Sequence, residues 1–165
     1  MNSLRNYKIR FVLLVLAIFF IVGSYRIVRA GVDNTTGNGA TAAISDYQFA
    51  GTATLTIHGR EKPADLVVMV LEPPVVDANG VQHVVATHEF TFADGSSIIT
   101  SDQEIATPTE TEGLYAITAI MDIASGTGLY EGVTGCLMAN GTIDFAAQPP
   151  AAQFEIAGAI ICPEQ

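Results

Sequence analysis

Residues 81–105 read VQHVVATHEFTFADGSSIITSDQEI, and this stretch decides the fold class. Apolar and polar side chains alternate up to Phe92, and a second such run begins at Ser97. A period of two is typical of a β-strand with one buried face. Asp94-Gly95 between the two runs is a strong signal for a hairpin turn. The stretch therefore predicts two antiparallel strands, and the inward face of the first carries Val84, Ala86, His88, Phe90 and Phe92.

The period of two continues on both sides of this hairpin. No helical stretch of useful length follows residue 31, and turn-forming residues such as Pro73-Pro74 separate the runs. Seven strands with short connections indicate an all-β sandwich or barrel, and a closed antiparallel up-and-down β-barrel is favoured because closure removes exposed strand edges. The predicted strands are 47–57, 65–71, 81–92, 97–105, 114–123, 135–145 and 153–162.

Charged residues are unevenly distributed along the chain. It has 165 residues, with 17 acidic side chains against 7 Lys and Arg and a formal net charge of −10. Residues 1–30 hold no acid and most of the basic side chains, so that Arg60 and Lys62 are the only Lys or Arg of residues 31–165. Phosphate binding needs a basic surface, so this acidic chain is not expected to bind nucleic acid.

The first 30 residues have the pattern of a secretory signal peptide. Met1–Arg10 is basic, Phe11–Gly23 is uncharged and mainly apolar, and Val28-Arg29-Ala30 fits a cleavage site. The apolar run spans about 20 Å as a helix, less than the roughly 30 Å hydrocarbon core of a bilayer. We therefore predict a signal helix that is cleaved after Ala30, and a secreted or periplasmic protein. An uncleaved membrane anchor is the alternative.

The segment that follows predicts a flexible leader. Residues 31–40 read GVDNTTGNGA, a composition dominated by Gly, Asn and Thr. The expected organisation is a signal peptide over 1–30, a flexible leader over 31–45 and a β-barrel domain over 46–165.

A family resemblance lies in residues 123–135, which read IASGTGLYEGVTG. The pattern Ile-x-x-Gly-x-Gly-x-aromatic-x-Gly-x-x-Gly between two strands resembles the allene oxide cyclase and dirigent barrel family, in a secreted bacterial-type member. Residues 90–96 also resemble a strand-turn-strand of that family. The resemblance, over approximately residues 84–162, implies an eight-stranded antiparallel barrel with an apolar cavity. The strand missing from our count would lie in 40–45 or at Val75-Val76.

The glycine-rich segment also has a physical interpretation of its own. Gly126, Gly128, Gly132 and Gly135 predict a tight, bulged reversal in which backbones approach closely, with Tyr130 covering the open end of the barrel. An architectural role is expected. A phosphate-binding loop is not, because no helix follows and no Lys lies nearby.

His88 is the most unusual residue of the predicted inward faces. It is either a core histidine with a hydrogen-bonded partner or a polar group that lines a cavity, where it could orient a ligand or move a proton. Ligand-binding candidates are His88, Phe90 and Tyr115, of which Tyr115 begins the apolar face of the 114–123 strand.

Two carboxylates add to the candidate site. Asp102 and Glu104 share a strand face with Ile98 and Thr100. Either they enter the barrel, where poor solvation would shift their pKa values and allow acid–base chemistry, or the strand emerges into solvent there. Candidates for catalysis are His88, Asp102, Glu104 and Tyr115, although no motif assigns a role to any of them.

Metal, cofactor and hydrolase motifs are not found. The sequence has no His-x-His, His-Glu-x-x-His, Cys-x-x-Cys or Gly-x-Ser-x-Gly, so neither a metal site nor a cofactor is expected. Cys136 and Cys162 open and close the last two predicted strands, and we expect them to form a disulfide in an oxidising compartment. Two buried free thiols are the alternative.

Three functions are compatible with these features. The first is an exported barrel, not an enzyme, that binds or shields a small apolar ligand. The second is a cyclase or isomerase that confines a hydrophobic substrate. The third is a structural or interaction protein of the cell envelope with a filled barrel. A small hydrophobic ligand and a homo-oligomer are the partners considered, and contact with a membrane is expected only through the signal segment.

Overall fold

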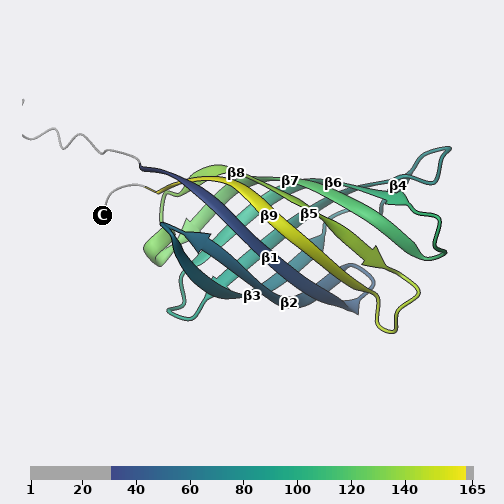
Figure 1. The fold of residues 1–165 in the computed structure, drawn as a ribbon, viewed down its shortest axis with the longest axis horizontal. Helices are drawn as coiled ribbons and strands as arrows, with labels where there is room; N and C mark the ends of the chain where they lie inside the picture. The colour runs from purple at the N-terminus through teal and green to yellow at the C-terminus, as the bar shows by residue number, and fades with distance from the viewer. Residues whose placement is uncertain (1–30, 163–165) are drawn as a thin grey trace, which may run out of the picture.

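The strands wrap into one closed antiparallel sheet (Figure 1). The computed structural model describes residues 31–162, so the predicted signal helix and its cleavage site lie outside the described residues. The elements are β1 (Gly31–Ser45), β2 (Gln48–Ile57), β3 (Arg60–Val70), β4 (Val75–Val76), β5 (Gln82–Phe92), β6 (Ser97–Pro108), β7 (Leu114–Thr127), the 3₁₀ turn η1 (Gly128–Tyr130), β8 (Thr134–Asp144) and β9 (Ala151–Cys162).

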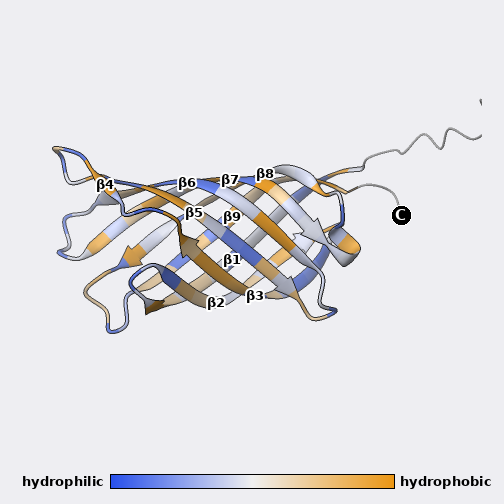
Figure 2. Cartoon of the chain, turned by 180° about the vertical axis from the view of Figure 1, so that it is seen from behind, coloured by the Kyte–Doolittle hydropathy of each residue, from blue (hydrophilic) through white to orange (hydrophobic). Residues whose placement is uncertain are grey.

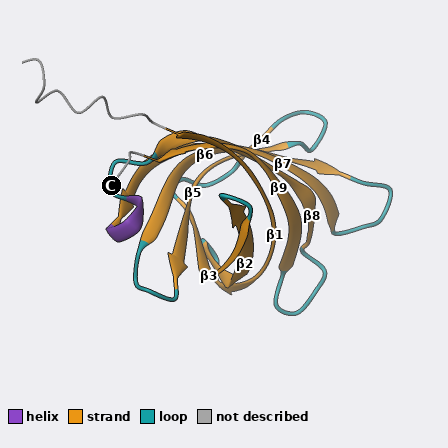
Figure 3. Ribbon diagram, turned by 60° about the vertical axis from the view of Figure 1, so that its left-hand side comes forward, coloured by secondary structure: helices purple, strands orange, loops and turns teal. Residues whose placement is uncertain are grey.

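Eight long strands form the barrel in up-and-down order. Each pairs with the next along the chain, β3 pairs with β5, and β1 closes the ring against β9. The two residues of β4 add a short ninth strand to the edge of β5. Figure 3 shows the strands curving around a common interior, with η1 at one end. The closed eight-stranded antiparallel barrel is therefore confirmed. No helix among residues 31–162 is long and apolar enough to cross a membrane.

Residues 31–45 are not a flexible leader, and the prediction for them was wrong. They form β1, which pairs along almost its whole length with β9 on one side and β2 on the other. Its inward positions are small, with Gly37 against Leu55 and Gly39 against the ring of Phe154. A Cβ on Gly39 would overlap that ring, so β1 contributes close backbone approach to the core and shows no hydrophobic period.

The missing eighth strand therefore lies in the segment that includes residues 40–45. The other proposed location, Val75–Val76, is the short β4. Figure 2 shows hydrophobic and hydrophilic stretches interleaved along the strands, as expected when one face of each strand is buried. The inward face of β5 agrees with the prediction, since Ala86, His88, Phe90 and Phe92 are all buried.

One end of the barrel is closed by the glycine-rich segment. Tyr130 of η1 is 6% exposed, and its ring centroid lies 4.7 Å from that of Phe92. Gly126 must lack a side chain here, because a Cβ would overlap the carbonyl of Tyr130, whose oxygen accepts a hydrogen bond from the Val133 amide. The expected reversal with Tyr130 over the barrel end agrees with this geometry.

The predicted disulfide does not form, and both cysteines are free. In the β8–β9 ladder Cys136 faces Ala159, three residues from Cys162, which instead pairs with Gly31. Three residues of strand separate Cα atoms by about 10 Å, beyond disulfide reach. The two side chains also differ in orientation, since Cys136 is exposed and Cys162 packs against the core. The error lay in the predicted register of this hairpin.

Candidate functional site

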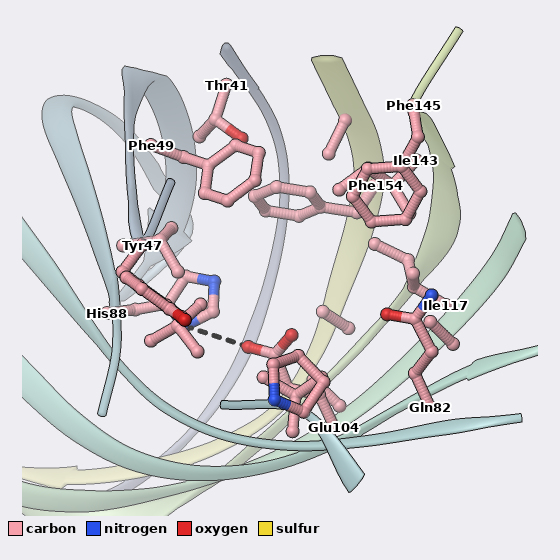
Figure 4. Close-up of a pocket in the computed structure, with 18 of the residues that line it drawn as sticks. Thr41, Tyr47, Phe49, Gln82, His88, Glu104, Ile117, Ile143, Phe145 and Phe154 are labelled. Carbon is pink, nitrogen blue, oxygen red and sulfur yellow. Dashed lines mark ion pairs between the residues drawn. The ribbon is translucent and has the colours of Figure 1, made fainter. Parts of the chain in front are cut away.

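The interior is not completely filled, and a cavity remains at the end opposite η1. It has a volume of about 140 Å³ and extends to the turns near β4. Tyr47 and Phe145 border it and are 47% and 38% exposed, so they mark its mouth. Apolar side chains make up most of the wall, and Phe49, Ile117, Ile143 and Phe154 are among them (Figure 4).

A polar cluster interrupts this apolar wall. His88 comes from β5, and Asp102 and Glu104 come from the neighbouring β6. His88 Nδ1 lies 2.8 Å from Asp102 Oδ2 and 3.8 Å from Glu104 Oε1, and the Asp102 side chain is completely buried. His88 and Glu104 line the cavity, whereas Asp102 lies behind them. We call these three side chains the His88 cluster.

The strand pairing explains how the cluster forms. Positions 102 and 104 are two apart on β6, so both side chains lie on the same strand face, which points into the barrel. His88 lies on β5, which pairs with β6. The hydroxyl of Thr100 accepts a hydrogen bond from the His88 amide at 3.2 Å and donates one to the His88 carbonyl at 3.4 Å. These contacts fix the backbone of His88 at the point where the imidazole enters the cavity.

Aromatic rings hold the imidazole on two sides. Phe90 is stacked on it with ring centroids 6.1 Å apart, and Phe154 meets it edge-on at 6.0 Å. Because Asp102 is an acceptor, Nδ1 carries the proton in the neutral ring and Nε2 keeps its lone pair. Figure 4 shows the second ring nitrogen on the side of Phe49 and Phe154, and no described residue forms a hydrogen bond with it.

Two carboxylate oxygens of the His88 cluster have no hydrogen-bond donor within residues 31–162. Asp102 Oδ1 and Glu104 Oε1 are buried oxygens without a hydrogen-bond partner among the described residues. Burial raises the pKa of Glu104, the charge of Asp102 adds to this rise, and His88 opposes it. The geometry thus offers unused acceptor atoms and a proton-exchanging group in an apolar cavity.

The structure brings most of the predicted site residues together. His88, Asp102 and Glu104 form one cluster, and the inward orientation considered for the carboxylates is the one found. Phe90 supports the imidazole from the core without lining the cavity. Tyr115 lies outside the cavity wall and packs against Phe145 near the mouth, with ring centroids 5.3 Å apart.

Sequence reasoning did not identify the aromatic part of the wall. Phe49 lies on the inward face predicted for the 47–57 strand, so its period could have marked it as a candidate. Phe154 alternates with the polar Gln153 and Glu155, which marks it as inward, but its place beside His88 depends on barrel closure through β1.

The His88 cluster also has the composition of a metal site, which was not expected. One donor atom from each of its side chains lies within 4.8 Å of the other two. The sequence signal was hidden because the three side chains come from two strands, with only the Asp-x-Glu pair local in sequence.

Comparison with known proteins assigns no family to this chain. No protein-family model matches the chain, and no curated protein matches it. Among solved structures, one pterocarpan synthase dirigent protein is 13% identical, with 86% of this chain and 92% of that chain covered and a TM-score of 0.43. A second one is 14% identical, with 83% and 97% covered and a TM-score of 0.43. Membership of the allene oxide cyclase and dirigent family stays a prediction.

Proposed function

We propose that this protein binds one small, mainly apolar molecule in the barrel cavity and that His88 recognises a polar group of this molecule. The observation that carries the proposal is a buried His88–Asp102 pair at the wall of an apolar cavity. Replacing such a pair with apolar side chains is often neutral or stabilising, so stability alone does not account for it. Convergent polar groups in an apolar pocket are typical of ligand sites.

The size of the cavity limits the ligand. Its volume of about 140 Å³ is close to that of an engineered apolar cavity of roughly 150 Å³ that binds benzene. A single ring with a small substituent therefore fits, and larger ligands would extend through the mouth between Tyr47 and Phe145. The free lone pair of His88 Nε2 favours a ligand that donates a hydrogen bond, such as a hydroxyl compound.

Matched ligands test this recognition. In calorimetric titrations with EDTA present, p-cresol should bind more tightly than toluene, because only p-cresol donates a hydrogen bond. The preference should disappear in His88→Leu and persist in His83→Leu, since His83 is an exposed histidine of the same strand. Ala139→Leu, which fills the cavity wall, should weaken both ligands. Equal affinities for the two ligands in the wild-type protein would refute the role of His88.

The second candidate function is a cyclase or isomerase, and the 2.8 Å His88–Asp102 contact favours it. A carboxylate that holds one imidazole nitrogen leaves the other to accept a proton from the substrate and to return it at a different atom. Such an isomerisation needs no co-reactant. In deuterated buffer, the barrel should speed deuterium exchange next to the carbonyl of cyclohexanone, and His88→Leu should not. An equal rate of deuterium exchange with both proteins would reject catalysis by His88 and leave ligand binding as the remaining function.

The third function, a filled structural barrel, is disfavoured by the cavity.

Export remains part of the proposal. Cleavage after Ala30 would leave β1 (Gly31–Ser45) and the other described strands intact. N-terminal sequencing of protein from its native host should begin at Gly31, whereas an intact Met1 in the membrane fraction would indicate an anchor.

A further inference from the structure

We propose that the His88 cluster binds one divalent transition-metal ion, with coordination positions left open towards the cavity. This site goes beyond the proposed function, because the metal ion and the small molecule can each bind without the other. It requires that the three side chains can surround one ion, that the cluster has unsatisfied donor atoms and that its charge is not already neutralised.

The distances suit a single ion. Zinc lies about 2.1 Å from imidazole nitrogen and carboxylate oxygen, so neighbouring ligand atoms are about 3.0–3.4 Å apart in octahedral or tetrahedral geometry. Nδ1 of His88 lies 2.8 Å from Asp102 Oδ2 and 3.8 Å from Glu104 Oε1. Coordination through Nδ1 requires the ring proton to move to Nε2, so the metal-bound form uses the other tautomer of the neutral imidazole. All three donor atoms lie within 4.8 Å of one another, so the side chains must draw together to surround one ion.

Unpartnered buried oxygens are the second observation. Asp102 Oδ1 and Glu104 Oε1 are both buried without a hydrogen-bond donor among the described residues. Buried acceptors of this kind are rare in folded proteins and are usually satisfied by a donor, water or an ion. A metal ion bound to Glu104 Oε1 and to both oxygens of Asp102 would satisfy the two unpartnered atoms together.

Charge gives the third argument. Buried Asp102 and partly buried Glu104 face one imidazole, and when both carboxylates are ionised a single imidazolium can balance only one of their two charges. The only Lys and Arg among residues 31–162 are Arg60 and Lys62, which begin β3 at the closed end of the barrel. Burying an unpaired charge is costly, and a divalent cation would remove that cost.

The donor set indicates the class of metal. Calcium and magnesium prefer all-oxygen sites, and copper(I) prefers sulfur ligands. One imidazole with two carboxylates suits Zn²⁺, Mn²⁺, Co²⁺ or Fe²⁺. Three protein ligands leave at least one position for water or for a polar group of a molecule in the cavity.

Titration of EDTA-treated, dialysed protein with Zn²⁺ tests the proposal. We expect one Zn²⁺ per chain, and a loss of more than about tenfold in affinity in His88→Asn and Glu104→Gln, since even outer-shell partners are worth that much. The exposed residues His83 and Glu89 of β5 provide matched controls, and His83→Asn and Glu89→Gln should bind as the wild type does. Absence of binding, or unchanged affinity in both cluster variants, would overturn the proposal.

The visible spectrum of the Co²⁺ form adds an independent readout. Nitrogen and oxygen ligands give ligand-field bands alone, whereas a thiolate charge-transfer band would assign the ion to Cys136 or Cys162 and overturn the proposal. The p-cresol and toluene titrations are run with EDTA present. If Zn²⁺ does not bind but the protein still prefers p-cresol to toluene, only the metal site fails. If Zn²⁺ binds but the preference for p-cresol is absent, only the proposed function fails.

Discussion

At the scale of single residues, we expect Asp102 to contribute strongly to the stability of the barrel. Its buried carboxylate holds the His88 ring at 2.8 Å. Asp102→Ala leaves the imidazole N–H without an acceptor, and we expect a loss of about 3 kcal/mol in the free energy of unfolding. Asp102→Asn keeps an oxygen acceptor and should lose about 1–2 kcal/mol. Urea unfolding of metal-free proteins measures both, and an alanine variant as stable as the wild type would contradict this role.

Tyr130 gives a prediction in alkaline solution. Burial raises its pKa from 10.0 to about 12, and the charges of Cys162 and Asp94 add to this rise. Between these values the unfolded chain ionises while the folded protein keeps the neutral phenol, so stability should fall as the pH rises from 10 towards 12. Tyr130→Phe should lose less stability over this window in urea unfolding. Equal losses in both proteins would argue against burial of the phenol.

Single residues were predictable where the local pattern was sufficient. The apolar neighbours of His88 at positions 84, 86, 90 and 92 gave its inward direction without any tertiary information. The same pattern left two orientations for Asp102 and Glu104, because carboxylates at alternate positions usually mark a solvent face. Only the pairing of β6 with β5 puts them beside an imidazole.

At the scale of elements, β1 is the strand on which barrel closure depends. It occupies the place between β9 and β2, so its removal would leave two unpaired strand edges and an open core. A chain of residues 46–165 should fail to form a folded monomer and should aggregate in size-exclusion chromatography, whereas residues 31–165 should fold. A cooperative, monomeric 46–165 domain would support the flexible leader that the structure replaces.

The β8–β9 hairpin gives a second prediction at this scale. Its register places Cys136 outside and Cys162 inside the barrel, so the thiols cannot meet without a shift of the strands. Protein unfolded without reductant should take up two alkylating groups per chain, as measured by intact mass. If the unfolded protein takes up no alkylating group before reduction and two after it, a disulfide is present and the register is wrong.

These two elements show what the sequence could not predict. A strand is recognised by apolar side chains at alternate positions, but β1 places Gly37 and Gly39 where its neighbours supply Leu55 and Phe154. The β8–β9 register was misjudged because setting Cys136 opposite Cys162 centres the hairpin on residue 149. The chain instead leaves the ladder early, and Phe145 donates its amide hydrogen to the Gly113 carbonyl at 2.8 Å.

At the scale of the whole molecule, the two ends of the barrel differ. The glycine-rich segment and Tyr130 close one end, and the other end keeps a cavity with the His88 cluster in its wall. Strand order favoured a closed barrel, because closure removes the edges of consecutive antiparallel strands, but the residue pattern gave only seven strands and the eighth came from the family resemblance. The cavity was not predictable, since it depends on how side chains from most of the strands fill the interior.

The proposed function depends on recognition of a small molecule by His88 in this cavity. Long-range proton–nitrogen NMR of nitrogen-15-labelled histidine rings tests it directly, with p-cresol added to metal-free protein. We expect the Nε2 resonance of His88 to shift most, while the rings of the exposed His58 and His83 stay unchanged. Unchanged His88 resonances at saturating p-cresol, or equal shifts of all three histidines, would contradict it.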